Sequence, residues 1–176
     1  MKYAVVALAV AVAGACGSVF LSVGLGLKAC PLCFYQRTFV FAVAAVLGVG
    51  LLADRGRAGL LCLLCVAPAV AGLGVAGFHE YLVLTGALEC PPGVLGLGTA
   101  PLQSLAVFAA LTALVAAGAW KASGESRTVR LLIPAAVVGG VLAWASIAAA
   151  PPLPKAPKAA YDPVKQPLDM CRRPFK

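Results

Sequence analysis

Five long apolar stretches, separated by short polar segments, run through most of the chain. A helix that crosses a bilayer needs about 20 mostly apolar residues. The apolar positions here do not alternate with the period of two that a strand would show. The pattern therefore predicts an all-α integral membrane protein with five spanning helices. The stretches cover residues 3–27, 33–53, 58–78 (extending to about 85), 102–120 and 131–150.

The composition supports this interpretation. Of the 176 residues, 62% are apolar and 11% are charged, whereas a soluble domain has about 45–50% and about 25%, respectively. A soluble domain of this size could not bury so much apolar surface, and a disordered chain would be far less hydrophobic. Both classes are therefore excluded.

The basic residues predict how the helices are oriented. Short cytoplasmic loops of membrane proteins carry an excess of Lys and Arg. The amino terminus and residues 54–57 and 121–130 carry six of them, whereas the 28–32 and 86–101 loops carry only Lys28. We therefore predict a cytoplasmic amino terminus and place the latter two loops on the outer side. The six residues are Lys2, Arg55, Arg57, Lys121, Arg127 and Arg130.

Residues 151–176 form a tail of different composition. It contains seven prolines and six of the fourteen basic residues, so we expect it to be extended. Five spans place this tail on the outer side, although its charge would favour the cytoplasm. The net charge of +8 does not indicate nucleic-acid binding, because no basic stripe interleaves with aromatic residues. The tail's charge suits lipid headgroups or an acidic partner.

The seven cysteines fall into two groups on this topology. Four lie on the outer side, where an oxidising compartment permits disulfides, and three lie in apolar helices, where free cysteine usually packs as a small apolar residue. A lipoprotein-like cleavage box at residues 13–16 is disfavoured because the apolar run continues far beyond a signal core. The outer four are Cys30, Cys33, Cys90 and Cys171, and the inner three are Cys16, Cys62 and Cys65.

The sequence Cys30-Pro31-Leu32-Cys33 lies at the outer mouth of the second span. Proline suits the first turn of a helix, so Cys30 should lie near the cap and both thiols near the positive end of the helix dipole. Arg37 follows one turn after Cys33 and adds positive charge. We therefore predict a thiolate, the reactive form, at Cys33.

Three alternatives compete with a redox pair. Haem attachment would require a histidine after Cys33, where Phe34 stands. A zinc site shared with Cys62 and Cys65 would have to bridge a whole span, roughly 30 Å, so we predict no metal site. An inert structural disulfide is the third alternative.

His79 and Glu80 lie at the outer end of the third span, at the level that Arg37 reaches from the second. Polar residues at such a depth are candidate site residues. The alternative is that His79 and Glu80 end the helix among the lipid headgroups.

The motif Cys30-Pro-Leu-Cys33-Phe-Tyr-Gln-Arg37 resembles the signature of the DsbB family, whose members are membrane thiol oxidases that pass electrons from a periplasmic dithiol protein to quinone. The resemblance covers roughly residues 3–120, and His79 precedes Cys90 by eleven residues. It implies a protein of the bacterial inner membrane. The domains expected are a four-helix DsbB-like domain over residues 1–120, an additional helix over 121–150 and a periplasmic tail over 151–176.

The resemblance also implies roles for individual residues. Cys30 and Cys33 would be the redox pair next to a quinone, either ubiquinone or menaquinone. Arg37 and His79 would lie beside the quinone head. Cys90 would receive the thiolate of a periplasmic thioredoxin-like oxidase similar to DsbA. Gln36 stands where an acidic residue is common in the family, so we assign it no role.

One departure from the family concerns the second cysteine pair. Members usually keep both of its cysteines in one loop between the third and fourth spans, but here the 86–101 loop contains only Cys90. Cys171 is the other outer cysteine. We predict that it replaces the missing loop cysteine and pairs with Cys90. An extended tail from Pro151 to Cys171 could reach about 60 Å, which is enough to return to the bundle.

Other function classes remain as alternatives. An enzyme similar to vitamin K epoxide reductase would share the quinone chemistry, but its C-x-x-C sits at a different helix end relative to the other cysteines. A non-catalytic membrane protein with two structural disulfides would show no quinone-dependent activity. A transporter would need polar or broken helices at mid-bilayer. Pro68 and Pro134 are the only prolines inside the spans and neither is accompanied by a charge, so the sequence gives little support for a transporter.

Overall fold

The computed structural model describes residues 1–123, 125–152, 161–162 and 164–175. It confirms an all-α fold, and the described residues contain no strand, only two isolated β-bridges. Five helices are long and apolar enough to cross a membrane. They are α1 (Lys2–Val23), α2 (Pro31–Ala53), α3 (Ala58–Leu84), α4 (Ala100–Ser123) and α5 (Glu125–Ala149), with short 3-10 turns at Arg55–Arg57 and Val94–Gly96.

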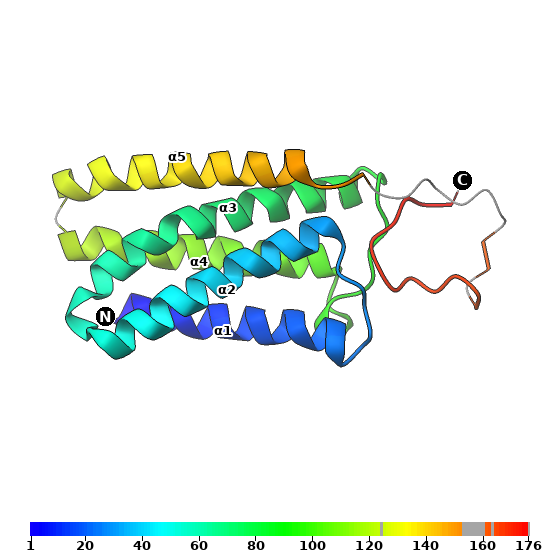
Figure 1. Ribbon diagram of the computed structural model, residues 1–176, viewed down its shortest axis with the longest axis horizontal. Helices are drawn as coiled ribbons and strands as arrows, with labels where there is room; N and C mark the ends of the chain where they lie inside the picture. The colour runs from blue at the N-terminus through cyan, green and yellow to red at the C-terminus, as the bar shows by residue number, and fades with distance from the viewer. Residues whose placement is uncertain (124, 153–160, 163, 176) are drawn as a thin grey trace.

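The five helices lie side by side in one elongated bundle (Figure 1). Helix α3 is central and contacts α2, α4 and α5, while α1 packs on α2 and α4. The amino terminus lies at one end of the bundle, and the α1–α2 connection, the α3–α4 connection and the described tail lie at the other (Figure 1). We call this second end the tail end.

Helix α1 is shorter than its apolar run. The sequence pattern predicts a span to residue 27, but the helix ends at Val23 and is followed by Gly24. Gly26 has φ +67°, a conformation that costs glycine little and residues with a Cβ much more. The chain therefore turns here, although Leu25 and Leu27 keep the segment apolar.

The connection between α4 and α5 also differs from the prediction. We expected residues 121–130 to form a loop, but α4 continues to Ser123 and α5 begins at Glu125. The polar residues of this segment extend the two helices beyond their apolar runs and do not form a ten-residue loop, since the segment contains no proline. Polarity here marks the ends of the apolar runs, and each helix extends further.

Small residues allow the helices to approach closely, as is common in membrane bundles. A Cβ added to Gly72 of α3 would overlap the ring of Phe108 on α4, and that ring is fully buried. Helix α1 packs through an alanine face. Its buried residues are Ala4, Ala7, Ala11 and Ala15.

The three cysteines of the apolar helices do not behave alike. Cys62 and Cys65 are buried in the core between the helices, which confirms their interpretation as packing residues. Cys16 is exposed on the outside of α1, so the packing interpretation is wrong for that residue. Apolar residues lie on both the buried and the exposed sides of α1, so hydrophobicity alone does not indicate which side faces its neighbours.

Candidate redox site

Four candidate site residues from three parts of the chain meet at the tail end. Cys30 and Cys33 come from the start of α2, His79 from α3 and Cys171 from the tail. The sulfur atoms and a ring nitrogen of these residues all lie within 4.8 Å of one another. These donors would also suit zinc, but the sulfur of Cys171 is bonded to Cys90 in this form of the protein.

The C-x-x-C motif adopts the helix start that its sequence predicts. Cys30 is the N-cap of α2, and Pro31 occupies the first turn. The sulfur atoms of Cys30 and Cys33 are hydrogen-bonded to each other at 2.9 Å, and the Cys30 sulfur also accepts a hydrogen bond from the Cys33 backbone N–H at 3.2 Å. Both cysteines are free thiols here.

These contacts favour a negative charge on Cys30. The hydrogen bond with the Cys33 side chain, aided by His79, lowers the pKa of Cys30 from 9.0 to about 5, although burial opposes the shift. The sequence analysis places the thiolate at Cys33, and this expectation is corrected for the dithiol form. The reason is that the Cys33 backbone N–H and the imidazole of His79 both lie against the sulfur at the cap.

His79 lies between the two cysteine pairs. Its side chain is fully buried, so it does not end α3 among headgroups. Its Nε2 atom is 3.8 Å from the Cys30 sulfur and 3.5 Å from the Cys90 sulfur. Its Nδ1 atom is 3.2 Å from Nε2 of Gln36. One imidazole therefore contacts a sulfur atom of each pair.

Gln36 is the site residue that the sequence analysis missed. It is buried on α2, and its amide holds the His79 ring. The signal that could have found it is a polar side chain one turn inside an apolar span, where polar residues are uncommon and usually functional.

Cys90 and Cys171 form a disulfide, as the sequence analysis predicts. Glu89 and Arg172, the residues beside them, form an antiparallel β-bridge through two backbone hydrogen bonds of 2.9 and 3.0 Å. The register of such a bridge puts Cys90 opposite Cys171 in a non-hydrogen-bonded position, where two strands come closest. Their Cα atoms are 4.1 Å apart.

Arg37 is fixed against α1. Its guanidinium donates to the Ser18 hydroxyl at 2.9 Å, to the Ser18 carbonyl at 2.8 Å and to the Ser22 hydroxyl at 2.6 Å. Three hydrogen bonds to one neighbouring helix hold this half-buried charge in a single orientation, as expected for a cation in a membrane bundle.

A cavity of about 420 Å³ lies beside the cysteine cluster. Such a volume is in the usual range for small-molecule sites. Its walls are mostly apolar, with Cys33, Arg37 and Cys171 on its polar side. His79, expected beside a quinone head, is not among the residues that line the cavity and instead contacts Cys30 and Cys90.

The cavity combines many apolar side chains with a few polar groups, among them Cys33 and the hydrogen-bonded guanidinium of Arg37. Such a lining is typical of a site for a small organic molecule.

Comparisons with known proteins identify the family of the chain. The family model described as Disulfide bond formation protein DsbB matches residues 2–145. Two proteins named Disulfide bond formation protein B 1, from Pseudomonas fluorescens strains Pf-5 and Pf0-1, are each 36% identical over 81 residues. The alignment covers 45% of this chain and 47% of each relative, so the chain spans about half the length of the curated relatives it matches. No solved structure gives a significant match. The family model covers most of the chain, and the chain belongs to the DsbB family of disulfide bond formation proteins.

Proposed function

We propose that this protein is a protein dithiol:quinone oxidoreductase of a bacterial inner membrane. It reoxidises a periplasmic thioredoxin-like protein similar to DsbA and passes the electrons to ubiquinone or menaquinone. The observation that carries the proposal is that the sulfur of Cys171, one half of a disulfide, lies within 4.8 Å of the sulfurs of Cys30 and Cys33. Two cysteine pairs at this distance suit an exchange relay. Two inert disulfides would not need to be adjacent.

The relay begins with the partner protein. A partner thiolate attacks Cys90, the bond from Cys90 to Cys171 breaks, and Cys171 leaves as a thiolate. That thiolate attacks Cys30 of a Cys30–Cys33 disulfide, so a Cys30–Cys171 disulfide forms and Cys33 leaves as a thiolate. The disulfide of the C-x-x-C pair has now been exchanged for a disulfide between Cys30 and Cys171 of the tail.

A second set of exchanges releases the oxidised partner. The partner's other thiolate attacks its own mixed disulfide and expels Cys90 as a thiolate. Cys90 then attacks Cys171, which closes the Cys90–Cys171 disulfide and leaves Cys30 and Cys33 as a dithiol. The structure has the bonding pattern of this last state, with one closed pair and two free thiols.

The dithiol is reoxidised at the cavity. A bound quinone supplies an acceptor for the two electrons and two protons that the Cys30–Cys33 pair loses when it becomes a disulfide. Cys33 lines the cavity and would be the sulfur next to the acceptor, while Arg37, held by Ser18 and Ser22, would orient the polar head of the quinone. His79 contacts the sulfur of Cys30 and can exchange a proton with it.

Replacement of Cys171 by alanine tests the relay. We expect Cys171→Ala to abolish oxidation of a reduced thioredoxin-like partner by the purified protein with a soluble quinone. Cys16→Ala, the same change at an exposed cysteine of α1, should leave turnover unchanged. Undiminished turnover in Cys171→Ala would refute the relay, and no turnover in the parent protein would favour a purely structural role for the disulfide.

Replacement of Arg37 by methionine tests the quinone site separately. We expect Arg37→Met to raise the apparent KM for quinone, because the charge that orients the quinone head is lost. Exchange of Cys90 with a small dithiol should continue, since Arg37 has no hydrogen bond to that pair among the described residues. An unchanged apparent KM would contradict the assignment of the cavity.

A further inference from the structure

The tail segment 169–172 is attached to both of the loops that carry its partner cysteines. Two residues before Cys30, Lys28 donates its backbone N–H to the Asp169 carbonyl at 2.8 Å, and its ammonium pairs with the Asp169 carboxylate at 2.8 Å. Glu89, next to Cys90, is joined to Arg172 by two backbone hydrogen bonds and an ion pair of 2.6 Å. The segment that contains Cys171 is therefore bound to the Cys30 and Cys90 loops by several contacts in addition to the disulfide.

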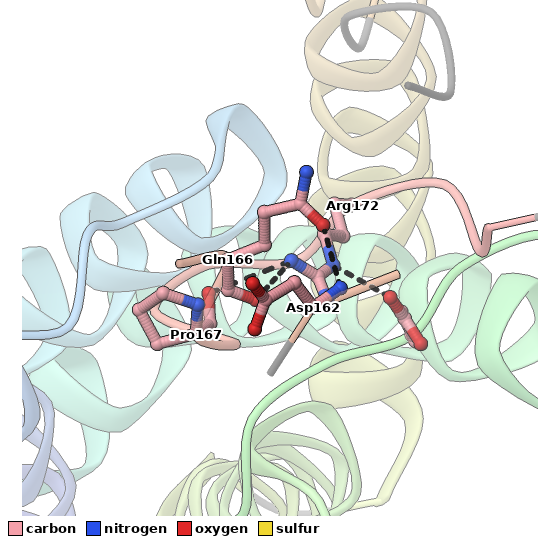
Figure 2. Close-up of polar contacts among 5 residues, drawn as sticks. Asp162, Gln166, Pro167 and Arg172 are labelled. Carbon is pink, nitrogen blue, oxygen red and sulfur yellow. Dashed lines mark hydrogen bonds and ion pairs between the residues drawn. The ribbon is translucent and has the colours of Figure 1, made fainter. Parts of the chain in front are cut away.

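Arg172 is the centre of these attachments. Besides its ion pair with Glu89, its Nη1 atom donates to the backbone carbonyl of Gln166 at 2.9 Å (Figure 2). Its guanidinium also lies over the rings of Tyr161 and Phe175, at 5.3 and 4.8 Å from their centroids. One side chain thus joins the outer loop after α3 to the folded part of the tail on both sides of Cys171.

We propose that Arg172 is a positioning residue that holds the Cys171 thiolate beside Cys30 while Cys90 is bonded to the partner protein. The proposal rests on the proposed relay, in which Cys171 must leave Cys90 and attack Cys30. The contacts that hold the tail involve Glu89, Lys28 and Asp169, and none of them uses a sulfur atom, so cleavage of the disulfide removes none of them directly.

The length of the tail explains why such a device is needed. Twenty residues separate Pro151 from Cys171, and a reactive group on a free chain of that length has an effective concentration of only about millimolar. A bound segment keeps the sulfur of Cys171 within 4.8 Å of the sulfur of Cys30. Attack of Cys171 on Cys30 can then compete with the return of Cys171 to Cys90 and with attack on Cys30 by external thiols.

The two ion pairs contribute unequally. Lys28 and Asp169 have side chains that are 70% and 39% exposed, and exposed pairs contribute little. Arg172 and Glu89 are 17% and 36% exposed, and their ion pair is reinforced by the β-bridge and the aromatic contacts. Arg172 is therefore the position where a substitution should loosen the tail.

A trapped intermediate tests the proposal without quinone or partner. In full-length protein that carries Cys33→Ala and Cys90→Ala, the outer thiols left are Cys30 and Cys171. Equilibration in glutathione buffers then measures the effective concentration of one thiol at the other, through the yield of the Cys30–Cys171 disulfide. We expect Arg172→Gln to lower this effective concentration about tenfold, with Arg172→Lys intermediate because lysine keeps the charge but not the fork of donors.

Arg173→Gln is the matched control, because it removes the same charge from the exposed neighbouring residue and should leave the effective concentration unchanged. An equal effective concentration in Arg172→Gln and in the background protein would overturn the proposal, as would an equal loss in Arg173→Gln. Circular dichroism would separate global unfolding from a loosened tail, and a folded Arg172→Gln protein with unchanged disulfide yield counts against us. Because the assay contains neither quinone nor partner, it can fail while Cys171 still proves essential for turnover.

Discussion

The hydrogen bonds to Cys30 predict an unusual acidity that can be measured directly. In the dithiol form the pKa of Cys30 is about 5, against 9.0 for an ordinary thiol. At pH 7 this corresponds to roughly 99% thiolate in place of roughly 1%. The Cys33 thiol is the largest cause of the shift, and His79 is the second favourable side chain.

The midpoint of the titration is a better readout than the rate of alkylation. The nucleophilicity of a thiolate falls with its pKa, with a Brønsted slope of about 0.4–0.5. Over a shift from 9.0 to about 5, this slope lowers the intrinsic reactivity roughly 40- to 100-fold, which nearly cancels the gain of about 100-fold in thiolate at pH 7. A normal alkylation rate at pH 7 would therefore say little about the pKa.

Ultraviolet absorbance of the thiolate against pH measures the midpoint. A reduced Cys90→Ala/Cys171→Ala protein retains Cys30, Cys33 and His79, and subtraction of the same protein with Cys30→Ala isolates the signal. We expect a midpoint near pH 5, an upward shift in His79→Asn and a larger upward shift in Cys33→Ala, following the order of the causes. A midpoint between pH 8 and 9 in the parent, or no shift in Cys33→Ala, would refute the reasoning.

Two further substitutions have effects that follow from packing and hydrogen bonding. Gln36→Leu removes the amide that holds Nδ1 of the buried His79, and should cost about 1–3 kcal/mol of unfolding free energy and displace the pH profile of turnover, both measurable on purified protein. Gly72→Ala would drive a methyl group into the ring of Phe108 and should lower the unfolding free energy in mixed detergent by about 1–3 kcal/mol. Gly77→Ala, on the same helix but with open space around an added Cβ, should cost nothing, and equal losses in the two alanine variants would contradict the close approach of α3 and α4.

The helices and the cysteine pairing could be predicted from the sequence, because each follows from the order and type of residues along the chain. Apolar runs of sufficient length predict spans, and the N-cap position of Cys30 follows from Pro31. The pairing of Cys90 with Cys171 followed from the family resemblance and from the side of the membrane assigned to each cysteine, and the structure contains that disulfide.

The contacts within the site depend on how each helix is rotated about its axis. That rotation is difficult to predict for a helix in which nearly all residues are apolar. Gln36 reaches His79 because α2 and α3 turn these faces toward each other. Arg37, one residue later, instead points to Ser18 and Ser22 of α1. The outward position of Cys16 could not be predicted either, because apolar residues lie on both the buried and the exposed sides of α1.

The low pKa of Cys30 also affects which disulfide is favoured at the end of the proposed relay. A thiol of lower pKa is a better leaving group in thiol–disulfide exchange. In a Cys30–Cys171 disulfide attacked by Cys90, the expelled group is the thiolate of Cys30, which the Cys33 thiol and His79 stabilise once it is free. The same contacts therefore favour the closed Cys90–Cys171 pair together with a free Cys30–Cys33 dithiol, which is the bonding pattern of the structure. Weakening them should leave more of the protein in the Cys30–Cys171 form, so the pKa of one buried thiol and the distribution of disulfides should change together.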